Sequence, residues 1–252
     1  MTFTGKSVLI TGGASGIGYA TAALFAQQGA RIVVADINEG GLATAVETLN
    51  PAGDGQVFGV PCDTADPDSC TELIEYAIRH LGTLDVVCNV AGVLSIGPTG
   101  SFTDEMWQKV VGVNLNGPFY ISKRAIPHLL ETRGCIVNVA STAALVGVPY
   151  GAAYSATKTG LIGLTKALAV EYSRAGVRVN AVCPGHVLTP MTAGGPGPGP
   201  DTDLDLMSRL APLTGKASEP SQIASAIAYL ASDAAANITG TTLTIDGGQT
   251  AI

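Results

Sequence analysis

The sequence is poor in charged and aromatic residues, and it has no long apolar run. Only 13% of its 252 residues are charged and 5% are aromatic, whereas 46% are hydrophobic and the mean hydropathy is +0.35. A helix that spans a bilayer needs about 20 consecutive apolar residues, and no stretch approaches that length. The apolar excess therefore predicts buried interfaces between subunits and not insertion into a membrane.

Positive charge is scarcer than negative charge. The chain has 13 Lys and Arg residues against 20 Asp and Glu residues, so its formal net charge is −7 and its isoelectric point is about 4.8. No run of Lys or Arg occurs, which argues against nucleic acid or an anionic membrane as a partner. The first residues lead into a strand-like run without the apolar core of a signal peptide, so we expect a cytoplasmic protein.

Metal-site patterns of cysteine and histidine are missing. The five cysteines are irregularly spaced, none forms a CxxC pair, and the three histidines have no metal-ligand spacing. We therefore expect a reduced chain that has no disulfide and binds no metal.

Strand-like apolar runs alternate with helical segments along the whole chain. We expect strands at residues 7–11, 31–36, 56–61, 84–90, 135–140, 177–182 and 241–246. We expect helices from the glycine-rich loop to residue 28, at 39–49, at 66–81, in two pieces from 103 to about 131, at 151–174 and at 220–232. This alternation predicts one α/β domain over residues 1–252, with a parallel sheet covered by helices on both faces.

One segment, residues 193–203, is rich in Gly and Pro and cannot form a helix or a central strand. It is either a disordered surface loop or part of a mobile lid. Its place after the sixth strand favours a lid over about 186–212, because ligands of open α/β sheets bind at the carboxyl ends of strands.

A glycine-rich turn joins the first strand to the first helix. Gly12, Gly16 and Gly18 would let the backbone approach a pyrophosphate closely, at a helix N-terminus that attracts anions. Asp36 ends the second strand, where a carboxylate can accept hydrogen bonds from a ribose 2′-OH and would repel a 2′-phosphate. No Lys or Arg lies in the turn or at 37–38, so the pattern favours NAD over NADP.

Tyr154 and Lys158 lie four positions apart in a predicted helix, on one face and one turn apart. A neighbouring ammonium favours the phenolate, so Tyr154 could act as an acid/base catalyst near neutral pH. Ser141, at the end of the fifth strand, could hydrogen-bond the same reacting oxygen. Taken alone, YxxxK is a common accidental pattern.

The predicted helix 151–174 is apolar around most of its circumference, so it must be covered on more than one side. One sheet covers one side only. We therefore expect a homo-oligomer, a dimer or a tetramer, formed through helices at about 112–131 and 151–174.

Several short motifs occur together in a known order. TGGASGIG, Asp63 in CDT, NVAG, Asn114 in GVNLNG, Ser141, YSATK and PGHVLTP resemble the short-chain dehydrogenase/reductase family over essentially the whole chain. The interval between Ser141 and Tyr154 is also the usual one in that family. The resemblance implies a Rossmann-type, doubly wound sheet of seven parallel strands and hydride transfer at C4 of a nicotinamide.

The resemblance also implies residue roles. Tyr154 would be the general acid/base, and Lys158 would bind the nicotinamide ribose and lower the tyrosine pKa. Ser141 would orient the substrate oxygen, and Asn114 would hold a water in a proton relay. For Asn114 the alternative is a structural amide at a helix bend near Pro118, and for Asp63 it is a turn.

The resemblance also implies further cofactor contacts. The chain departs from the family at one position, where Val90 stands in place of the second Asn of NNAG. This departure puts a hydrogen bond of the loop in doubt and leaves the catalytic residues unaffected. The expected NAD-binding residues are Gly12, Ser15, Gly16, Ile17, Gly18, Asp36, Ile37, Cys62, Asp63, Asn89, Ala91, Gly92, Tyr154, Lys158, Pro184, Gly185, Val187 and Thr189.

The expected substrate pocket is mostly apolar, and this suits a secondary alcohol or ketone with a hydrophobic part. Its candidate residues are Leu94, Ile96, Thr142, Val148, Tyr150, His186, Leu188 and Met191. One alternative is a 3-oxoacyl thioester (acyl-carrier-protein) reductase of the same family, whose members mostly use NADPH, which Asp36 disfavours. Another is a catalytically silent NAD-binding regulatory module.

Overall fold

The computed structural model describes residues 2–50, 56–193 and 202–251. Its centre is one seven-stranded parallel sheet in the order β3-β2-β1-β4-β5-β6-β7, which confirms the predicted doubly wound, Rossmann-type fold. The strands are β1 (Ser7–Thr11), β2 (Arg31–Asp36), β3 (Val57–Pro61), β4 (Val86–Asn89), β5 (Cys135–Val139), β6 (Arg178–Pro184) and β7 (Thr242–Ile245).

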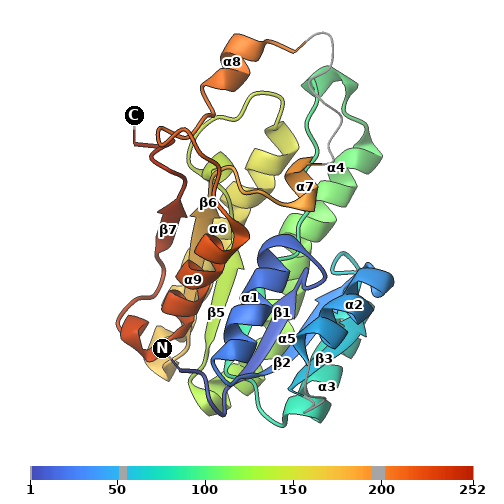
Figure 1. Ribbon diagram of the computed structural model, residues 1–252, viewed down its shortest axis with the longest axis vertical. Helices are drawn as coiled ribbons and strands as arrows, with labels where there is room; N and C mark the ends of the chain where they lie inside the picture. The colour runs from blue at the N-terminus through green and yellow to red at the C-terminus, as the bar shows by residue number, and fades with distance from the viewer. Residues whose placement is uncertain (1, 51–55, 194–201, 252) are drawn as a thin grey trace.

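The helices connect the strands as crossovers (Figure 1). They are α1 (Gly16–Gln27), α2 (Glu39–Leu49), α3 (Pro67–Leu81), α4 (Asp104–Val111), α5 (Gly117–Thr132), α6 (Ala152–Tyr172), α7 (Pro190–Ala193), α8 (Leu204–Ser208) and α9 (Pro220–Ala231). The predicted ends of α3 are confirmed. The Asp66 side chain accepts a hydrogen bond from the Asp68 amide at the start, and Gly82 follows the end at a φ of 80°.

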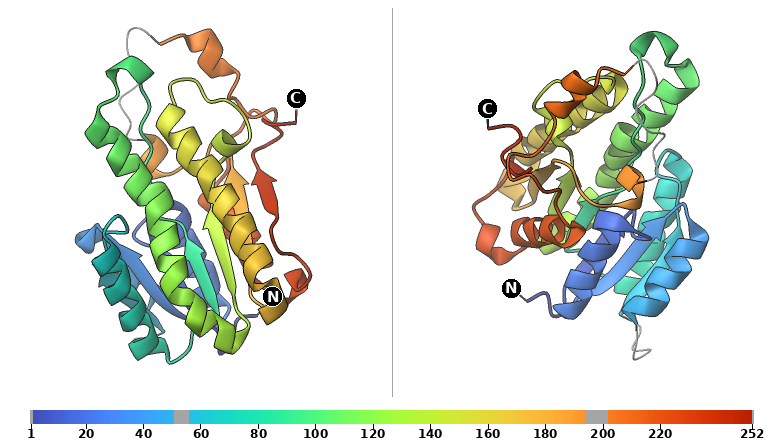
Figure 2. Two further views of the ribbon diagram at one scale, coloured as in Figure 1. Left: turned by 180° about the vertical axis from the view of Figure 1, so that it is seen from behind. Right: turned by 45° about the horizontal axis from the view of Figure 1, so that its top comes forward.

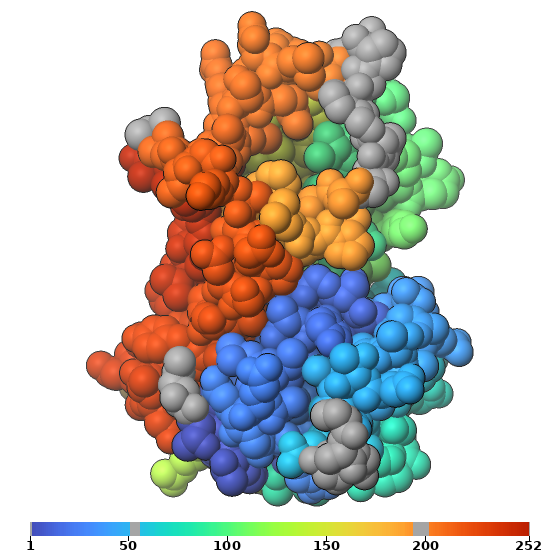
Figure 3. All heavy atoms as spheres, viewed as in Figure 1, coloured from blue at the N-terminus to red at the C-terminus, as the bar shows by residue number. Residues whose placement is uncertain are grey.

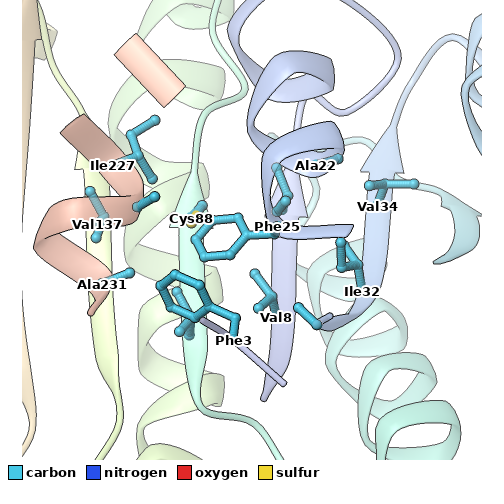
Figure 4. Packing of buried hydrophobic residues seen from close by; sticks show 14 of the residues in the cluster. Phe3, Val8, Ala22, Phe25, Ile32, Val34, Cys88, Val137, Ile227 and Ala231 are labelled. Atoms are coloured by element: carbon cyan, nitrogen blue, oxygen red, sulfur yellow. The ribbon is translucent and has the colours of Figure 1, made fainter. Parts of the chain in front are cut away.

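Helices cover both faces of the sheet. In Figure 1 α1, α2 and α9 lie in front of it, and α3, α5 and α6 cover the back, as the left view of Figure 2 shows. The front core packs Phe25 of α1 and Ile227 of α9 on the strand residues Val8, Ile32 and Val137 (Figure 4). A second buried cluster fills the back layer. Both strand faces are therefore apolar, which explains the continuous hydrophobic runs in the sequence.

The strand order reverses at β1, which lies between β2 and β4. The loops that follow β1 and β4 meet at this switch point, where open α/β sheets bind ligands. Thr11, the last residue of β1, accepts hydrogen bonds through Oγ1 from the amides of Val90 and Ala91, both at 3.1 Å. These two bonds explain why β4 ends at Asn89, before the predicted residue 90, because the Val90 amide bonds a side chain and not the backbone of a neighbouring strand.

The predicted loop at 186–212 is only partly a loop. It contains the short helices α7 and α8, and Asp203 caps α8 by accepting a hydrogen bond from the Leu206 amide. Most of the Gly/Pro-rich segment lies outside the described residues, so the alternative of lid or disordered loop stays a prediction. Among the described residues, no helix is long and apolar enough to cross a membrane.

A π-helical turn, Gly112–Asn116, joins α4 to α5 within the span where the sequence predicts two helical pieces. π-turns interrupt the regular backbone ladder and often mark functional sites. Here the turn carries Asn114.

Candidate active site

A cavity of about 90 Å³ lies at the carboxyl ends of β4, β5 and β6. It brings together the predicted catalytic residues, Ser141 from the loop after β5 and Tyr154 and Lys158 from α6. The predicted cofactor residues that also line it are Ile17, Gly92, Pro184, Gly185, Val187 and Thr189. Met191, predicted for the substrate side, and Thr192 complete one wall. In the space-filling view α7 lies directly above α1 and the glycine-rich turn (Figure 3).

Lys158 is fixed at the base of this cavity. Its side chain is 3% exposed, and Nζ donates a hydrogen bond to the carbonyl oxygen of Val139 at 2.8 Å. Nζ lies 5.7 Å from the centroid of the Tyr154 ring. Burial lowers the pKa of Lys158 to about 8, because removing an ammonium from water disfavours its charged form. The amine is therefore near its titration point at physiological pH.

Tyr154 stands beside Ser141, but its pKa moves against the predicted direction. Burial raises the pKa of Tyr154 above its ordinary value of 10.0, and the neighbouring Ser141 hydroxyl opposes that rise only in part. The lowering of the Tyr154 pKa that the resemblance implies for Lys158 does not show in this direction, and the acid/base role of Tyr154 stays a prediction. Desolvation outweighs the favourable contacts there. Ser141 itself is fixed, since its Oγ accepts a hydrogen bond from the Ala143 amide at 3.1 Å.

Asn114 is fully buried and connects the π-turn to the loop after β4. Its Oδ1 accepts from the Val93 amide at 2.8 Å, and its Nδ2 donates to the Val93 carbonyl oxygen at 2.9 Å. A Cβ added to Gly92 would lie 3.3 Å from Asn114 Oδ1 and 3.5 Å from Lys158 Nζ. The amide and the amine therefore both lie beside Gly92, and the predicted structural role at a helix irregularity is also present.

The glycine-rich turn is tight for a specific steric reason. Gly12 has a φ of 69°, and a Cβ there would lie 2.9 Å from the Ala91 backbone. A Cβ on Gly18 would lie 1.9 Å from the Gly12 carbonyl oxygen, so the turn folds onto the first turn of α1. Ser15 begins that helix without a side-chain cap, which leaves its first backbone N–H groups without a capping acceptor.

Asp36 is oriented by the same turn. Its carboxylate accepts hydrogen bonds from the Ala14 amide at 3.0 Å and from the Asn38 amide at 2.9 Å. Ile37 next to it is 70% exposed. A fixed carboxylate and an apolar side chain therefore stand together at the end of β2.

Three other predicted cofactor residues have structural contacts of their own. The Asn89 side chain is 2% exposed and donates through Nδ2 to Asn138 Oδ1 at 2.8 Å. Cys62 is also buried, within the back core. Asp63 is exposed and accepts a hydrogen bond from the Ala65 amide at 2.9 Å, which is the turn role considered above. The side chains of Asn89 and Cys62 thus support the cleft from within the core.

Only some of the predicted substrate-side residues line a cavity. Leu94 and Met191 line a second cavity of about 540 Å³ together with Met106, Lys109 and Val110 of α4. Thr142 instead is 4% exposed and donates to Gln249 Oε1 at 3.5 Å, so it joins the C-terminal segment to the Ser141 loop. The remaining candidates line neither of these two cavities and are Ile96, Val148, Tyr150, His186 and Leu188.

Sequence reasoning missed two hydroxyl groups. Thr11 holds the loop after β4, as described above, and Thr192 donates to the Val187 carbonyl oxygen at 2.7 Å, which closes the turn beside the cavity. Thr11 could have been found from its position, because it ends the first strand directly before the glycine-rich turn. Nothing local to the sequence distinguishes Thr192 from any other surface threonine.

A further cavity of about 400 Å³ lies at the opposite, amino-terminal edge of the sheet. Its most buried cation, Arg178, donates to the carbonyl oxygens of Leu230, Ser232 and Ile238. This guanidinium bonds carbonyl oxygens at and after the C-terminal end of α9. It therefore has a structural role, and its cavity is separate from the candidate active site.

Comparisons with known proteins agree with this arrangement. The protein-family model described as enoyl-(acyl carrier protein) reductase matches residues 12–250. The chain is 38% identical over 250 residues to the cyclohexanol dehydrogenase of Acinetobacter sp. (strain SE19), covering 98% of this chain and 96% of that protein. It is similar to the crystal structure of levodione reductase, with a TM-score of 0.91, 33% identity and 99% of each chain covered.

A second solved structure is also similar over nearly the whole chain. The 3-ketoacyl-(acyl-carrier-protein) reductase from Brucella melitensis, crystallised in complex with NADH, has a TM-score of 0.89 and 32% identity. The match covers 99% of this chain and 100% of that one. The motif order, the sheet and these relatives converge, and the chain belongs to the short-chain dehydrogenase/reductase family.

Proposed function

We propose that this chain transfers a hydride between NAD(H) and a secondary alcohol or ketone with a hydrophobic part. The observation that carries the proposal is the convergence of Ser141, Tyr154 and Lys158 on one cavity beside the glycine-rich turn. A regulatory module without turnover would have no use for a buried amine, a phenol and a hydroxyl arranged around one space. We therefore favour an enzyme over a silent NAD-binding module.

The chain's own groups fit a dinucleotide. The steric need for glycine at positions 12 and 18 and the uncapped start of α1 form a cradle for a pyrophosphate. Ile17, Gly92, Val187 and Thr189 would hold the nicotinamide end. Asp63, Asn89 and Ala91 stay proposals for the adenosine end, with the Asn89 contact limited to its backbone because its side chain is buried.

Asp36 supports NAD over NADP. The two backbone amides that bond its carboxylate keep it at the end of β2, where it would accept hydrogen bonds from a ribose 2′-OH. The same charge would repel a 2′-phosphate, and no Lys or Arg at 12–18 or 37–38 offsets it. The NADH complex of the Brucella relative agrees with this preference.

The catalytic proposal assigns the proton transfer to Tyr154. As phenolate it would take the hydroxyl proton of an alcohol, and as phenol it would return that proton to a ketone. Ser141 would hold the reacting oxygen, and Lys158 would favour the phenolate. Asn114, which is hydrogen-bonded to Val93, would hold a water in a proton relay. A bound nicotinamide would supply or accept the hydride, and its oxidised ring would further favour the phenolate.

The substrate class follows from the apolar walls. Leu94, Met106, Val110 and Met191 line the larger cavity, which suits a hydrophobic ring or chain. The similarity to cyclohexanol dehydrogenase and levodione reductase supports a cyclic alcohol or ketone. A 3-oxoacyl thioester reductase is the second candidate, which the similarity to the Brucella enzyme supports.

Assembly and location are also proposals. The outward side of α6 exposes Ala156, Gly163, Ala167 and Val170, and α5 exposes Phe119. Apolar and small side chains on adjacent helices support a dimer or tetramer through α5 and α6. A cytoplasmic location stays a prediction from the sequence.

The test measures turnover through the change in NADH absorbance with a panel of cyclic and linear secondary alcohols and ketones. NADP(H) is the comparison cofactor. The proposal expects turnover of cyclic substrates with NAD(H). Preferred turnover of 3-oxoacyl thioesters would support the second candidate, and binding of NADH without any turnover would support the regulatory module.

A further inference from the structure

Tyr150 does not line either cavity of the candidate active site, but it connects three segments around it. Its hydroxyl oxygen accepts a hydrogen bond from the Asp203 amide at 2.9 Å, directly before α8. Its carbonyl oxygen accepts one from the Gly97 amide at 2.9 Å, in the loop after β4. Tyr150 itself immediately precedes Gly151, the N-cap residue of α6.

The backbone of Tyr150 is unusual. Its φ is 60°, a left-handed value that costs a bulky residue free energy, and Arg133 is the one other non-glycine residue with positive φ in the described part of the chain. Such a conformation persists where the surrounding contacts stabilise it. The hydrogen bonds with Gly97 and Asp203 stabilise it here, and the second one holds the ring against the residue that precedes α8.

The bond to Asp203 fixes the start of α8. Asp203 caps this helix through the Leu206 amide at 2.9 Å, so the residue that Tyr150 holds is also the one that starts the helix. Leu204, the first helical residue, is 63% exposed, and α8 lies at the end of the molecule toward which the carboxyl ends of the strands point (Figures 1 and 2).

Other exposed apolar side chains lie on the segments that border the same end. Leu94 is 37%, Met191 44% and Leu188 51% exposed. An apolar ligand that covered such side chains would gain free energy from the apolar area removed from water. The contribution of Leu204 to this gain is larger if α8 is held in place before the ligand binds, because ordering α8 on binding costs entropy.

We propose that Tyr150 is a positioning residue that holds α8 over the substrate side and thereby sets the affinity for the apolar part of the substrate. This inference rests on the proposed function for its kinetic readout. Tyr150 acts through α8 and not on the reacting atoms. Its effect should therefore grow with substrate size and leave the chemical step unchanged.

The test compares Tyr150→Phe with the wild-type enzyme on 2-butanol and on a substituted cyclohexanol. Loss of one hydrogen bond should raise KM for the cyclohexanol by about 2- to 10-fold, with kcat and the Kd of NADH unchanged. KM for 2-butanol should change by less than about 2-fold. Tyr229→Phe on α9, a half-exposed tyrosine far along the chain, is the matched control and should behave as wild type.

A second pair of variants isolates the bond itself. Asp203 has a φ of −73°, which proline adopts, so Asp203→Pro removes the N–H donor together with the carboxylate cap. Asp203→Ala removes only the cap. If the bond acts as proposed, Tyr150→Phe combined with Asp203→Pro raises KM no further than Asp203→Pro alone, whereas Tyr150→Phe still has its full effect beside Asp203→Ala.

Hydrogen exchange gives a readout that needs no turnover. In the ligand-free Tyr150→Phe variant, amides of the peptide at 203–208 should exchange about 2- to 10-fold faster, with α6 unchanged. Equal KM increases for both alcohols, a fall in kcat, or unchanged exchange at 203–208 would each overturn the inference. If the wild type turns over no alcohol, the proposed function fails, and the exchange result alone decides whether Tyr150 holds α8.

Discussion

Lys158 donates a hydrogen bond to the carbonyl oxygen of Val139 at 2.8 Å, which places a buried amine at the carboxyl end of β5. The pKa of this amine falls from an ordinary 10.5 to about 8 because burial disfavours its charge. Between these two pH values the unfolded chain binds more protons at this residue than the folded chain does. Stability therefore rises with pH in that window, through the contribution of this one group.

The first prediction concerns the folding free energy that is lost by burying the charged amine of Lys158. Lys158→Met should be more stable than the wild type at pH 7, by up to about 3 kcal/mol, because each pKa unit is worth about 1.4 kcal/mol. The advantage should shrink as pH rises from 8 to 10.5. Urea unfolding of both proteins at several pH values measures it. Exposed Lys166 on the same helix gives the control, since Lys166→Met should show no such pH dependence.

Cofactor preference should depend on the charge of Asp36. Asp36→Asn keeps one oxygen, which can accept either the Ala14 or the Asn38 amide, and removes the negative charge. The ratio of kcat/KM for NADPH to that for NADH should rise by roughly 10-fold or more, because like charges a few ångströms apart repel by one to several kcal/mol. Steady-state kinetics with both cofactors measures this ratio. An unchanged ratio would remove Asp36 as the selecting group.

Asn114 should contribute to stability as well as to the active site. Asn114→Ala leaves the partly buried amide and carbonyl of Val93 without their partner, which should cost about 2–4 kcal/mol of unfolding free energy. Asn116 lies in the same π-turn but is half-buried, so Asn116→Ala is a suitable control and should cost less than about 1 kcal/mol. Denaturant unfolding distinguishes the two. Equal losses would mean that the turn, and not the Val93 pair, sets the stability.

Assembly should depend on the outward face of α6. Val170 is 80% exposed in the single chain, so an oligomer through α6 would bury it. Val170→Glu should shift the wild-type dimer or tetramer toward smaller species in gel filtration with light scattering, because it places a charge in an apolar contact. Thr48→Glu, on the exposed side of α2, should leave the assembly unchanged. A wild-type chain that elutes as a 25.4 kDa monomer would refute the proposed assembly.

Much of this architecture could be predicted because its signals are local. The alternation of runs gives the parallel sheet, and Asp66 and Gly82 give both ends of α3. The positions of Ser141, Tyr154 and Lys158 could be named because short motifs hold them at fixed intervals after strands and along one helix.

The remaining features depend on tertiary contacts. The pKa of Tyr154 rises because of burial, which no spacing reveals. The left-handed backbone of Tyr150 and the π-turn at Asn114 depend on partners many residues away in the sequence. Thr142 looks like a pocket residue from its place after Ser141, yet its hydroxyl bonds Gln249 in the C-terminal segment.

The most direct test of the central claim is turnover by Tyr154→Phe, measured alongside its Kd for NADH. A general acid/base at this position predicts that kcat falls by at least about 10²-fold, while NADH binds nearly as well as to the wild type and to the control Tyr229→Phe. Wild-type turnover in Tyr154→Phe would contradict the account.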